Sequence, residues 1–249
     1  MKSIKISISI VNHQHGILVT DLLSDLLKLN YFELEIIVTN NVDDYLVESY
    51  VMANNNIIYI KNIIPFGFGK NHNNAFKISS GDYFIVLNPD VRIKSIDFTR
   101  LVNYFNINQQ VFCITPKVVD VKGNLEDSVR DFPSIIDLMV RFVFHRTKFY
   151  HESIITPTKI PWAAGIFLMF SRDKYEYLNG FDERYFMYME DVDICYRISR
   201  KHGDLIYFPE VEIVHDARRN NRKKLKHFFW HLKGVFRFFN KKYIFIFFK

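Results

Sequence analysis

The sequence predicts an α/β fold, with one mostly parallel sheet covered by helices on both faces. Short apolar stretches of strand type alternate with stretches of helical periodicity through the first half of the chain. This alternation is typical of strand–helix–strand units, whose strands lie parallel. The chain has 249 residues, 49% of them hydrophobic, and can bury one good core. We therefore expect one elaborated domain.

The expected elements follow from the apolar patterns in chain order. The first half predicts strands over 5–11, 34–38, 57–60 and 83–87, and helices over 17–29, 43–53 and 71–79. The less regular second half predicts strands over 166–170, 205–208 and 211–214, and helices over 135–144, 172–178, 192–201 and 221–240. No repeat or linker marks a boundary before residue 217, so we expect a domain over 1–217 and a separate basic segment over 218–249.

The net charge of +6 is concentrated at the carboxyl end. Residues 218–249 contain eleven Lys or Arg and no Asp or Glu, which leaves 22 basic against 27 acidic residues, or −5, in the rest of the chain. The acidic body does not suit a nucleic-acid-binding domain, whereas the basic, aromatic-rich end predicts an anionic partner, either membrane phospholipid or nucleic acid. Cys113 and Cys195 lack CxxC spacing, and no secretory signal is found at the start, so we expect a reducing, cytoplasmic location.

Polar loops follow three of the predicted strands. They are residues 12–15, 39–41 and 88–90. Ligands of parallel α/β sheets bind beyond the carboxyl ends of the strands, so we expect these loops to converge on one ligand. Each loop alone could equally be a turn, because Asn and Asp side chains bond their own backbone.

Asp90 is the first candidate for chemistry, because Asn88-Pro89-Asp90 directly follows the apolar stretch 83–87. A carboxylate in this position suits Mg²⁺ or Mn²⁺, which could also bind two phosphate oxygens. His215 follows another apolar stretch and could complete the metal shell. The alternatives are a Pro-directed turn at Asp90 and a purely structural role for His215.

Two further segments carry candidate residues. Residues 66–74 contain Gly67, Gly69 and Asn71 where a strand leads into a helix, which allows close backbone approach and favours anions, although a Gly-rich turn is the simpler reading. Residues 186–193 place carboxylates at a helix start beside aromatic residues. Helix starts are often acidic, but a carboxylate beside an apolar wall can act as a general base. Asp191 is our candidate for this role and Glu190 its competitor.

These segments, in this order, resemble glycosyltransferase family 2, and within it the bacterial rhamnosyltransferase-like group that builds surface polysaccharides. The resemblance covers residues 3 to about 240. It rests on the opening strand 7–12, the Gly-Phe turn 66–69, the element Leu87-Asn88-Pro89-Asp90-Val91, the tetrad Trp162-Ala163-Ala164-Gly165 and residues 179–193. The last two are the most specific, because they resemble the acceptor-side signature of the group.

The resemblance implies a GT-A fold and an inverting transfer from a nucleotide-sugar donor. It implies a divalent metal held by Asp90 and His215, with Asp191 as the base that deprotonates the acceptor hydroxyl. The residues implied to bind the nucleotide sugar are Ser9, Val11, Asn12, Asn40, Gly67, Gly69, Asn71 and Asn88. Those implied on the acceptor side are Trp162, Ala164, Gly165 and Glu190.

Two departures from the family pattern affect these expectations. Asn40 stands where the family usually has Asp, and Asn88 replaces the first Asp of the general metal-binding element. An amide both donates and accepts hydrogen bonds, so Asn40 leaves the identity of the nucleotide base open. The expected donor is dTDP-rhamnose, with UDP- or GDP-hexoses as alternatives, and a catalytically silent nucleotide-sugar or glycan-binding subunit is the rival from another class.

The basic end predicts contact with the inner face of the cell membrane. Aromatic residues interleave with cations over 223–242, and the segment is too short to span a bilayer, so we expect it to lie on the surface near a lipid-linked oligosaccharide acceptor. The alternative is a helix packed on the body by its aromatic face. Nucleic acid is not an expected partner.

Overall fold

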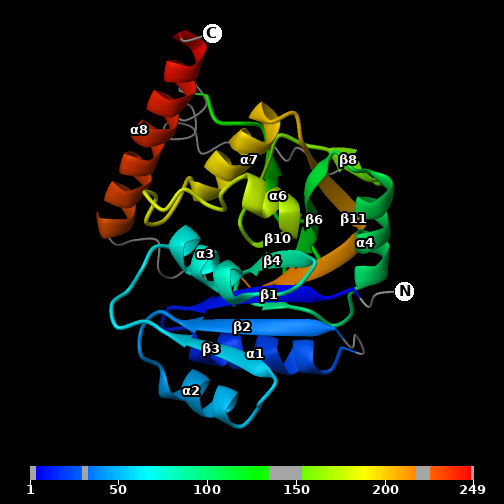
Figure 1. Cartoon of the computed structure of the whole chain (residues 1–249), viewed down its shortest axis with the longest axis vertical. Helices are drawn as coiled ribbons and strands as arrows, with labels where there is room; N and C mark the ends of the chain where they lie inside the picture. The colour runs from blue at the N-terminus through cyan, green and yellow to red at the C-terminus, as the bar shows by residue number, and fades with distance from the viewer. Residues whose placement is uncertain (1–3, 30–32, 135–152, 217–224, 248–249) are drawn as a thin grey trace.

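A computed structural model describes residues 4–29, 33–134, 153–216 and 225–247, with side chains up to residue 242. A nine-stranded mixed sheet forms its centre, in the order β3-β2-β1-β4-β10-β6-β11-β5, with β8 paired to β11 (Figure 1). The predicted helix over 135–144 lies outside the described residues. In the described part of the chain, no helix is both long enough and apolar enough to cross a bilayer.

The first half has the expected alternation of strands and helices. Its strands are β1 (Ile6–Asn12), β2 (Leu34–Asn40), β3 (Ile57–Lys61) and β4 (Tyr83–Leu87), and its helices are α1 (Gly16–Leu27), α2 (Tyr45–Met52) and α3 (Phe68–Ile78). β1 pairs in parallel with both β2 and β4, and β2 with β3. All four carboxyl ends therefore meet at one edge, as the sequence predicts.

The second half makes the sheet mixed. It contributes the strands β5 (Val91–Arg92), β6 (Val111–Val119), β8 (Thr158–Lys159), β10 (Phe167–Ser171) and β11 (Asp204–His215). β10 lies antiparallel between β4 and β6, whereas β11 runs parallel to β6. The start of β10 therefore lies at the same edge as the carboxyl end of β4. β7 (Val129–Arg130) and β9 (Trp162–Ala163) form a separate two-stranded ribbon.

Two strands that the sequence predicts separately form one continuous strand in the structure. The expected strands over 205–208 and 211–214 form the single strand β11, whose register shifts between Phe208 and Glu212. Pro209 lies in this irregular stretch, and it lacks the N–H that a regular ladder needs. The apolar pattern therefore predicts two strands where the chain forms one bulged strand.

The helices cover both faces of the sheet, and each face has its own core. One core packs α1 and α4 (Phe98–Ile107) against inward residues such as Ile8 and Ile85. The other packs α3, α6 (Arg172–Tyr177) and α7 (Glu190–Arg200) against residues that alternate with these, such as Phe84 and Val86. This alternation is what buries both faces of a covered sheet.

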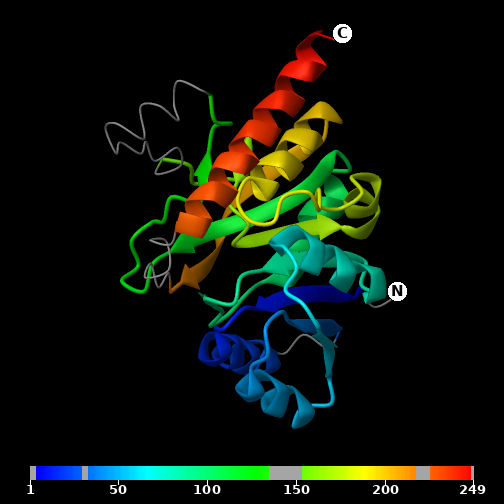
Figure 2. The same cartoon turned by 90° about the vertical axis from the view of Figure 1, so that its left-hand side faces the viewer.

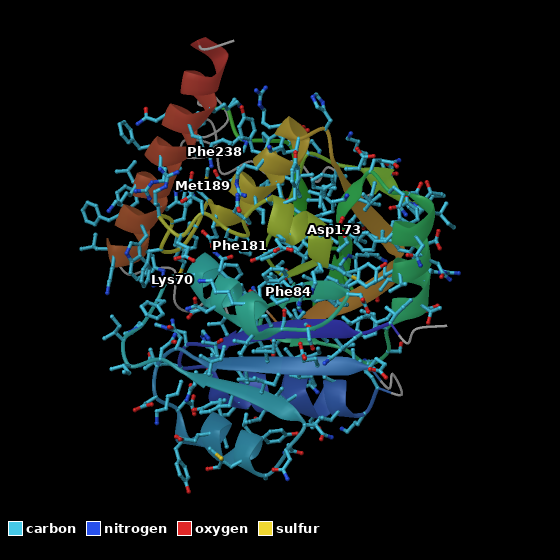
Figure 3. The ribbon with its side chains drawn as sticks, viewed as in Figure 1. Lys70, Phe84, Asp173, Phe181, Met189 and Phe238 are labelled. Atoms are coloured by element: carbon cyan, nitrogen blue, oxygen red, sulfur yellow. The ribbon has the colours of Figure 1, made fainter. Side chains whose placement is uncertain are left out.

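The last helix, α8 (Leu225–Phe247), runs alongside α7 (Figure 2). A small third core joins α8 to α7 and the segment before it, and Met189 and Phe238 lie in this contact (Figure 3). Lys241 Nζ reaches the fully buried Asp193 of α7, 2.6 Å from Oδ1. Part of the basic segment 218–249 thus packs on the body, as the alternative interpretation expected.

Candidate active site

Asp90 lies in the turn between β4 and β5, and backbone hydrogen bonds hold this turn on both sides. The Asn88 N–H donates to the Ile166 carbonyl at 2.9 Å, and the Asp216 N–H donates to the Asp90 carbonyl at 2.8 Å. The turn is therefore tied to the segment before β10 and to the end of β11. The Asp90 side chain is partly exposed at the ligand edge of the sheet.

His215 ends β11 and lies between two carboxylates. Its Nε2 is 3.2 Å from Asp90 Oδ1, and its Nδ1 is 2.6 Å from Glu126 Oε2. Burial lowers the pKa of His215, but its interactions with Asp90 and Glu126 outweigh burial and leave the pKa above its usual value. Nothing in the sequence points to Glu126, because it lies in a turn after β6 and matches no motif.

The residues present fit a divalent cation with few protein ligands. Asp90 Oδ1 is buried and has no hydrogen bond of good geometry, even to the nearby His215. The Glu126 carboxylate holds the opposite ring nitrogen, an arrangement that orients a metal-binding imidazole. Among residues 4–29, 33–134, 153–216 and 225–247, no three His, Cys, Asp or Glu side chains are arranged so that all could hold one metal ion. Asp90 and His215 would therefore supply two ligands, and substrate oxygens or water the others.

Asp191 lies in the first turn of α7, beside the buried Glu190. The Asp191 carboxylate accepts hydrogen bonds from the Gly165 N–H at 3.3 Å and from the Val192 N–H at 2.8 Å. Burial raises the pKa of Asp191, although these bonds and the Trp162 side chain oppose the rise. Burial and the adjacent Asp191 charge also raise the pKa of Glu190 well above its usual value. Two carboxyls in such an environment do not both ionise readily, which is suited to proton transfer.

The turn of Asp90 and the helix start of Asp191 meet through one short segment. Ile166 accepts the Asn88 N–H, and the preceding Gly165 donates to Asp191. The metal candidate and the base candidate therefore lie at the same edge of the sheet, on either side of residues 165–166. A separate hollow of about 810 Å³ lies beside β5 and is lined by residues such as Lys28 and Lys94. Neither Asp90 nor Asp191 lines it.

The other acceptor-side candidates also gather around Asp191. Trp162 begins β9 and Ala164 follows it, and the Ala164 N–H donates to the Ser128 carbonyl at 2.8 Å. The guanidinium of Arg130, on the paired strand β7, lies 5.3 Å from the centre of the Trp162 ring. The two-stranded ribbon thus places the Trp162 side chain next to the Asp191 carboxylate.

The candidates on β1 and β2 mainly use their side chains inside the protein. Asn12 and Asn40 are fully buried; their amides lie 2.8 Å apart, and Asn40 is 2.9 Å from the Tyr59 hydroxyl. Ser9 is also fully buried, with its hydroxyl 2.8 Å from His72 Nδ1, while Val11 is half-buried. Asn12 and Asn40 end their strands at the ligand edge, whereas Ser9 lies further inside the sheet.

Gly67 and Gly69 allow another part of the protein to come close. A Cβ at Gly67 would lie 2.6 Å from the Phe186 carbonyl oxygen, and one at Gly69 would lie 2.5 Å from the Phe181 Cβ. The buried Asn71 bonds the Phe66 carbonyl at 3.2 Å. The glycines thus bring the segment 181–186, which leads to Asp191, against the start of α3.

Comparison with known proteins supports the sequence resemblance. The family model described as Glycosyl transferase family 2 matches residues 7–178. The chain belongs to glycosyltransferase family 2. This member is 34% identical to rhamnosyltransferase WbbL of Escherichia coli K12, over 95% of this chain and 93% of the relative. It is 30% identical to N-acetylglucosaminyl-diphospho-decaprenol L-rhamnosyltransferase of Mycobacterium tuberculosis, over 63% of this chain and 54% of that protein. The enzyme is an inverting glycosyltransferase.

Solved structures confirm the GT-A fold of this family 2 member. They include GalNAc-T7 with UDP, GalNAc and Mn²⁺, at a TM-score of 0.67 and 16% identity, and mannosyltransferase PcManGT of Pyrobaculum calidifontis with GDP-Man and Mn²⁺, at 0.61 and 14%. Staphylococcus aureus TarS 1-349 matches at 0.60 and 13%. The matches cover 86% to 87% of this chain but only 43%, 58% and 60% of those chains, respectively. Divalent metal thus occurs in enzymes of this fold.

Proposed function

We propose that this glycosyltransferase transfers rhamnose from dTDP-rhamnose to a hydroxyl of a lipid-linked glycan, in the synthesis of a bacterial cell-surface polysaccharide. The observation that carries the proposal is the link through Gly165 and Ile166, because it sets a candidate base and a candidate metal ligand at one edge of the sheet. The identity to two rhamnosyltransferases supports rhamnose, and the diphospho-decaprenol in the name of one supports a lipid-linked acceptor.

In the proposed step, the acceptor oxygen bonds to the anomeric carbon from the face opposite the diphosphate. The acceptor proton passes to the Asp191 carboxylate, and the electron pair of the breaking carbon–oxygen bond leaves with the nucleoside diphosphate. Burial makes Asp191 a stronger base than an exposed carboxylate, since it raises the pKa. Mg²⁺ or Mn²⁺ on Asp90 and His215, when bound, would stabilise the charge of the leaving group.

Asp191→Asn tests the assignment of the base. The amide is nearly isosteric but cannot take the proton, so we expect kcat to fall by about 10²-fold or more while the donor binds as before. A thermal-shift screen of nucleotide sugars with and without Mn²⁺ identifies the donor, because a bound ligand stabilises the folded state. Unchanged turnover in Asp191→Asn would remove Asp191 as the base, and stabilisation by UDP- or GDP-hexoses alone would overturn the choice of donor.

We also propose that the enzyme is cytoplasmic and docks on the inner membrane face through the outer side of α8. An exposed apolar stripe runs along this side at helical spacing, formed by Leu225, Phe228, Phe229, Leu232 and Phe236. The described side chains of α8 include five Lys or Arg and no Asp or Glu. An apolar stripe among cations suits an anionic lipid surface.

Vesicle flotation tests this docking. We expect binding to vesicles with anionic lipid, weaker binding at high salt, and a loss of about tenfold or more in the double variant Phe229→Ser/Phe236→Ser. The control is Ile107→Ser, because Ile107 is more exposed than Phe229 and Phe236 but lies on α4. Equal binding by the double variant would contradict the proposal, as would binding to DNA in preference to the vesicles.

A further inference from the structure

The segment that leads into Asp191 has an unusual backbone. Tyr188 and Met189 both have positive φ, at 71° and 70°, in the left-handed region that non-glycine residues rarely adopt. Met189 is also the residue directly before α7, so its conformation sets the direction in which Glu190 and Asp191 leave the segment. Such strain persists only where the surrounding structure holds it in place.

The structure that holds this segment comes largely from α8. Gly234 is buried against it, and a Cβ there would lie 2.9 Å from the Tyr188 carbonyl oxygen and 3.2 Å from the Met189 Cβ. A helix can approach a backbone so closely only without a side chain at that position. The Tyr188 hydroxyl lies 2.8 Å from His227 Nδ1, so a second turn of α8 also contacts the segment.

Aromatic contacts extend the same interface. The Trp230 ring lies 4.6 Å from the Phe186 ring, between the positions of His227 and Gly234 along α8. The Phe186 carbonyl in turn accepts the Phe68 N–H at 2.8 Å. Residues 186–189 are therefore held between the start of α3 on one side and α8 on the other.

We infer that α8 is a positioning element for the catalytic base: through Gly234, His227 and Trp230 it fixes the left-handed pair Tyr188–Met189 and so sets the direction of the Asp191 carboxylate. The inference rests on the proposed role of Asp191 and is independent of membrane docking, because these three residues contact the body of the enzyme. Gly234 is a positioning residue, since it reaches no substrate itself.

Gly234→Ala tests the inference with a short-chain, water-soluble acceptor, so that membrane binding plays no part. The new methyl group would lie 2.9 Å from the Tyr188 carbonyl oxygen, so the backbone at Tyr188 and α8 must move apart. We expect kcat to fall about tenfold or more, with the KM for the donor within about twofold of the wild-type value. Introduced into Asp191→Asn, the same change should cause no further loss. Asn240→Ala, at an exposed position of α8, is the matched control and should retain full activity.

Hydrogen exchange gives a readout that needs no activity. The Asp193 N–H donates to the Met189 carbonyl at 2.9 Å, and we expect it to exchange faster in Gly234→Ala than in Asn240→Ala. Unchanged kcat and exchange would overturn the inference, and so would an equal loss of kcat in the Asp191→Asn background. Absence of transfer by the wild type would refute the proposed function instead. Hydrogen exchange would then still test whether α8 holds residues 188–189 in place. If Gly234→Ala does not fold, Tyr188→Phe takes its place and should lower kcat in the same way.

Discussion

Glu126→Gln should weaken divalent metal binding. The Glu126 carboxylate is 14% exposed, and its oxygen lies 2.6 Å from His215 Nδ1, so the bond is short, charged and mostly shielded from water. A hydrogen bond to a charged group contributes about 1.5–3 kcal/mol and a neutral one about 0.5–1.5 kcal/mol. The substitution should therefore cost about 1–2 kcal/mol, or roughly 5- to 30-fold in affinity.

The assay is a titration with Mn²⁺ at saturating nucleoside diphosphate, with free Mn²⁺ followed by electron paramagnetic resonance. Wild type and variants are titrated at the same alkaline pH, because the raised pKa of His215 favours protons in competition with a metal for Nε2. Glu212→Gln is the matched control, because Glu212 lies on the same strand but is half-exposed and pairs with Lys117. Equal Mn²⁺ affinity in wild type and Glu126→Gln would refute the reasoning, and so would an equal loss in the control.

Three further outcomes are expected. Burial raises the pKa of Glu35, but hydrogen bonds from Lys5, Ser7 and Ser80 lower it to about 2 from 4.5. This stabilisation is therefore present above pH 4.5 and lost as the pH falls toward 2. After allowance for the exposed Lys5, Glu35→Gln should lower the free energy of unfolding by about 2 kcal/mol at pH 7 and by much less at pH 3, as measured with urea. The same difference at both pH values would contradict this. Asn73→Ala removes four hydrogen bonds, three to Phe181 and Glu183 in the segment before Asp191 and one to the Tyr175 hydroxyl. It should therefore lower the free energy of unfolding by about 3 kcal/mol, whereas Asn240→Ala should have little effect. The rise of kcat with pH should have its midpoint above 3.8, because burial raises the pKa of Asp191; a midpoint at 3.8 would contradict the assignment.

The sequence predicted the first half of the fold well, because its strands and helices are local patterns with clear periodicity. β1 to β4 and α1 to α3 were each predicted within a few residues. Short strands such as β5 and β9 escaped prediction, since two residues show no periodicity and pair only in the tertiary structure. The mixed sheet also could not be read locally, because the direction of β10 depends on its neighbours.

The same distinction applies to the candidate site. Asp90 and Asp191 could be proposed because they lie in motifs, and His215 because it follows an apolar stretch. Asp90 and His215 do lie together. Glu126 and Gly234 could not, since one comes from an irregular turn and the other from a helix whose contact with residues 188–189 is long-range. For Gly67 and Gly69 the sequence allowed both an anion site and a simple Gly-rich turn, and their close contacts in the structure are with Phe186 and Phe181, respectively.

The close contact between Gly234 and Tyr188 has a consequence for protein engineering. A chimera that takes α7 from one relative and α8 from another would join two surfaces shaped for different partners, and a single added methyl group at this crossing is enough to disturb the fit. Exchanges intended to alter acceptor choice should therefore transfer α7, the preceding segment and α8 as one cassette. The strands that carry Asn12 and Asn40, and the turn that carries Asp90, can then stay with the recipient.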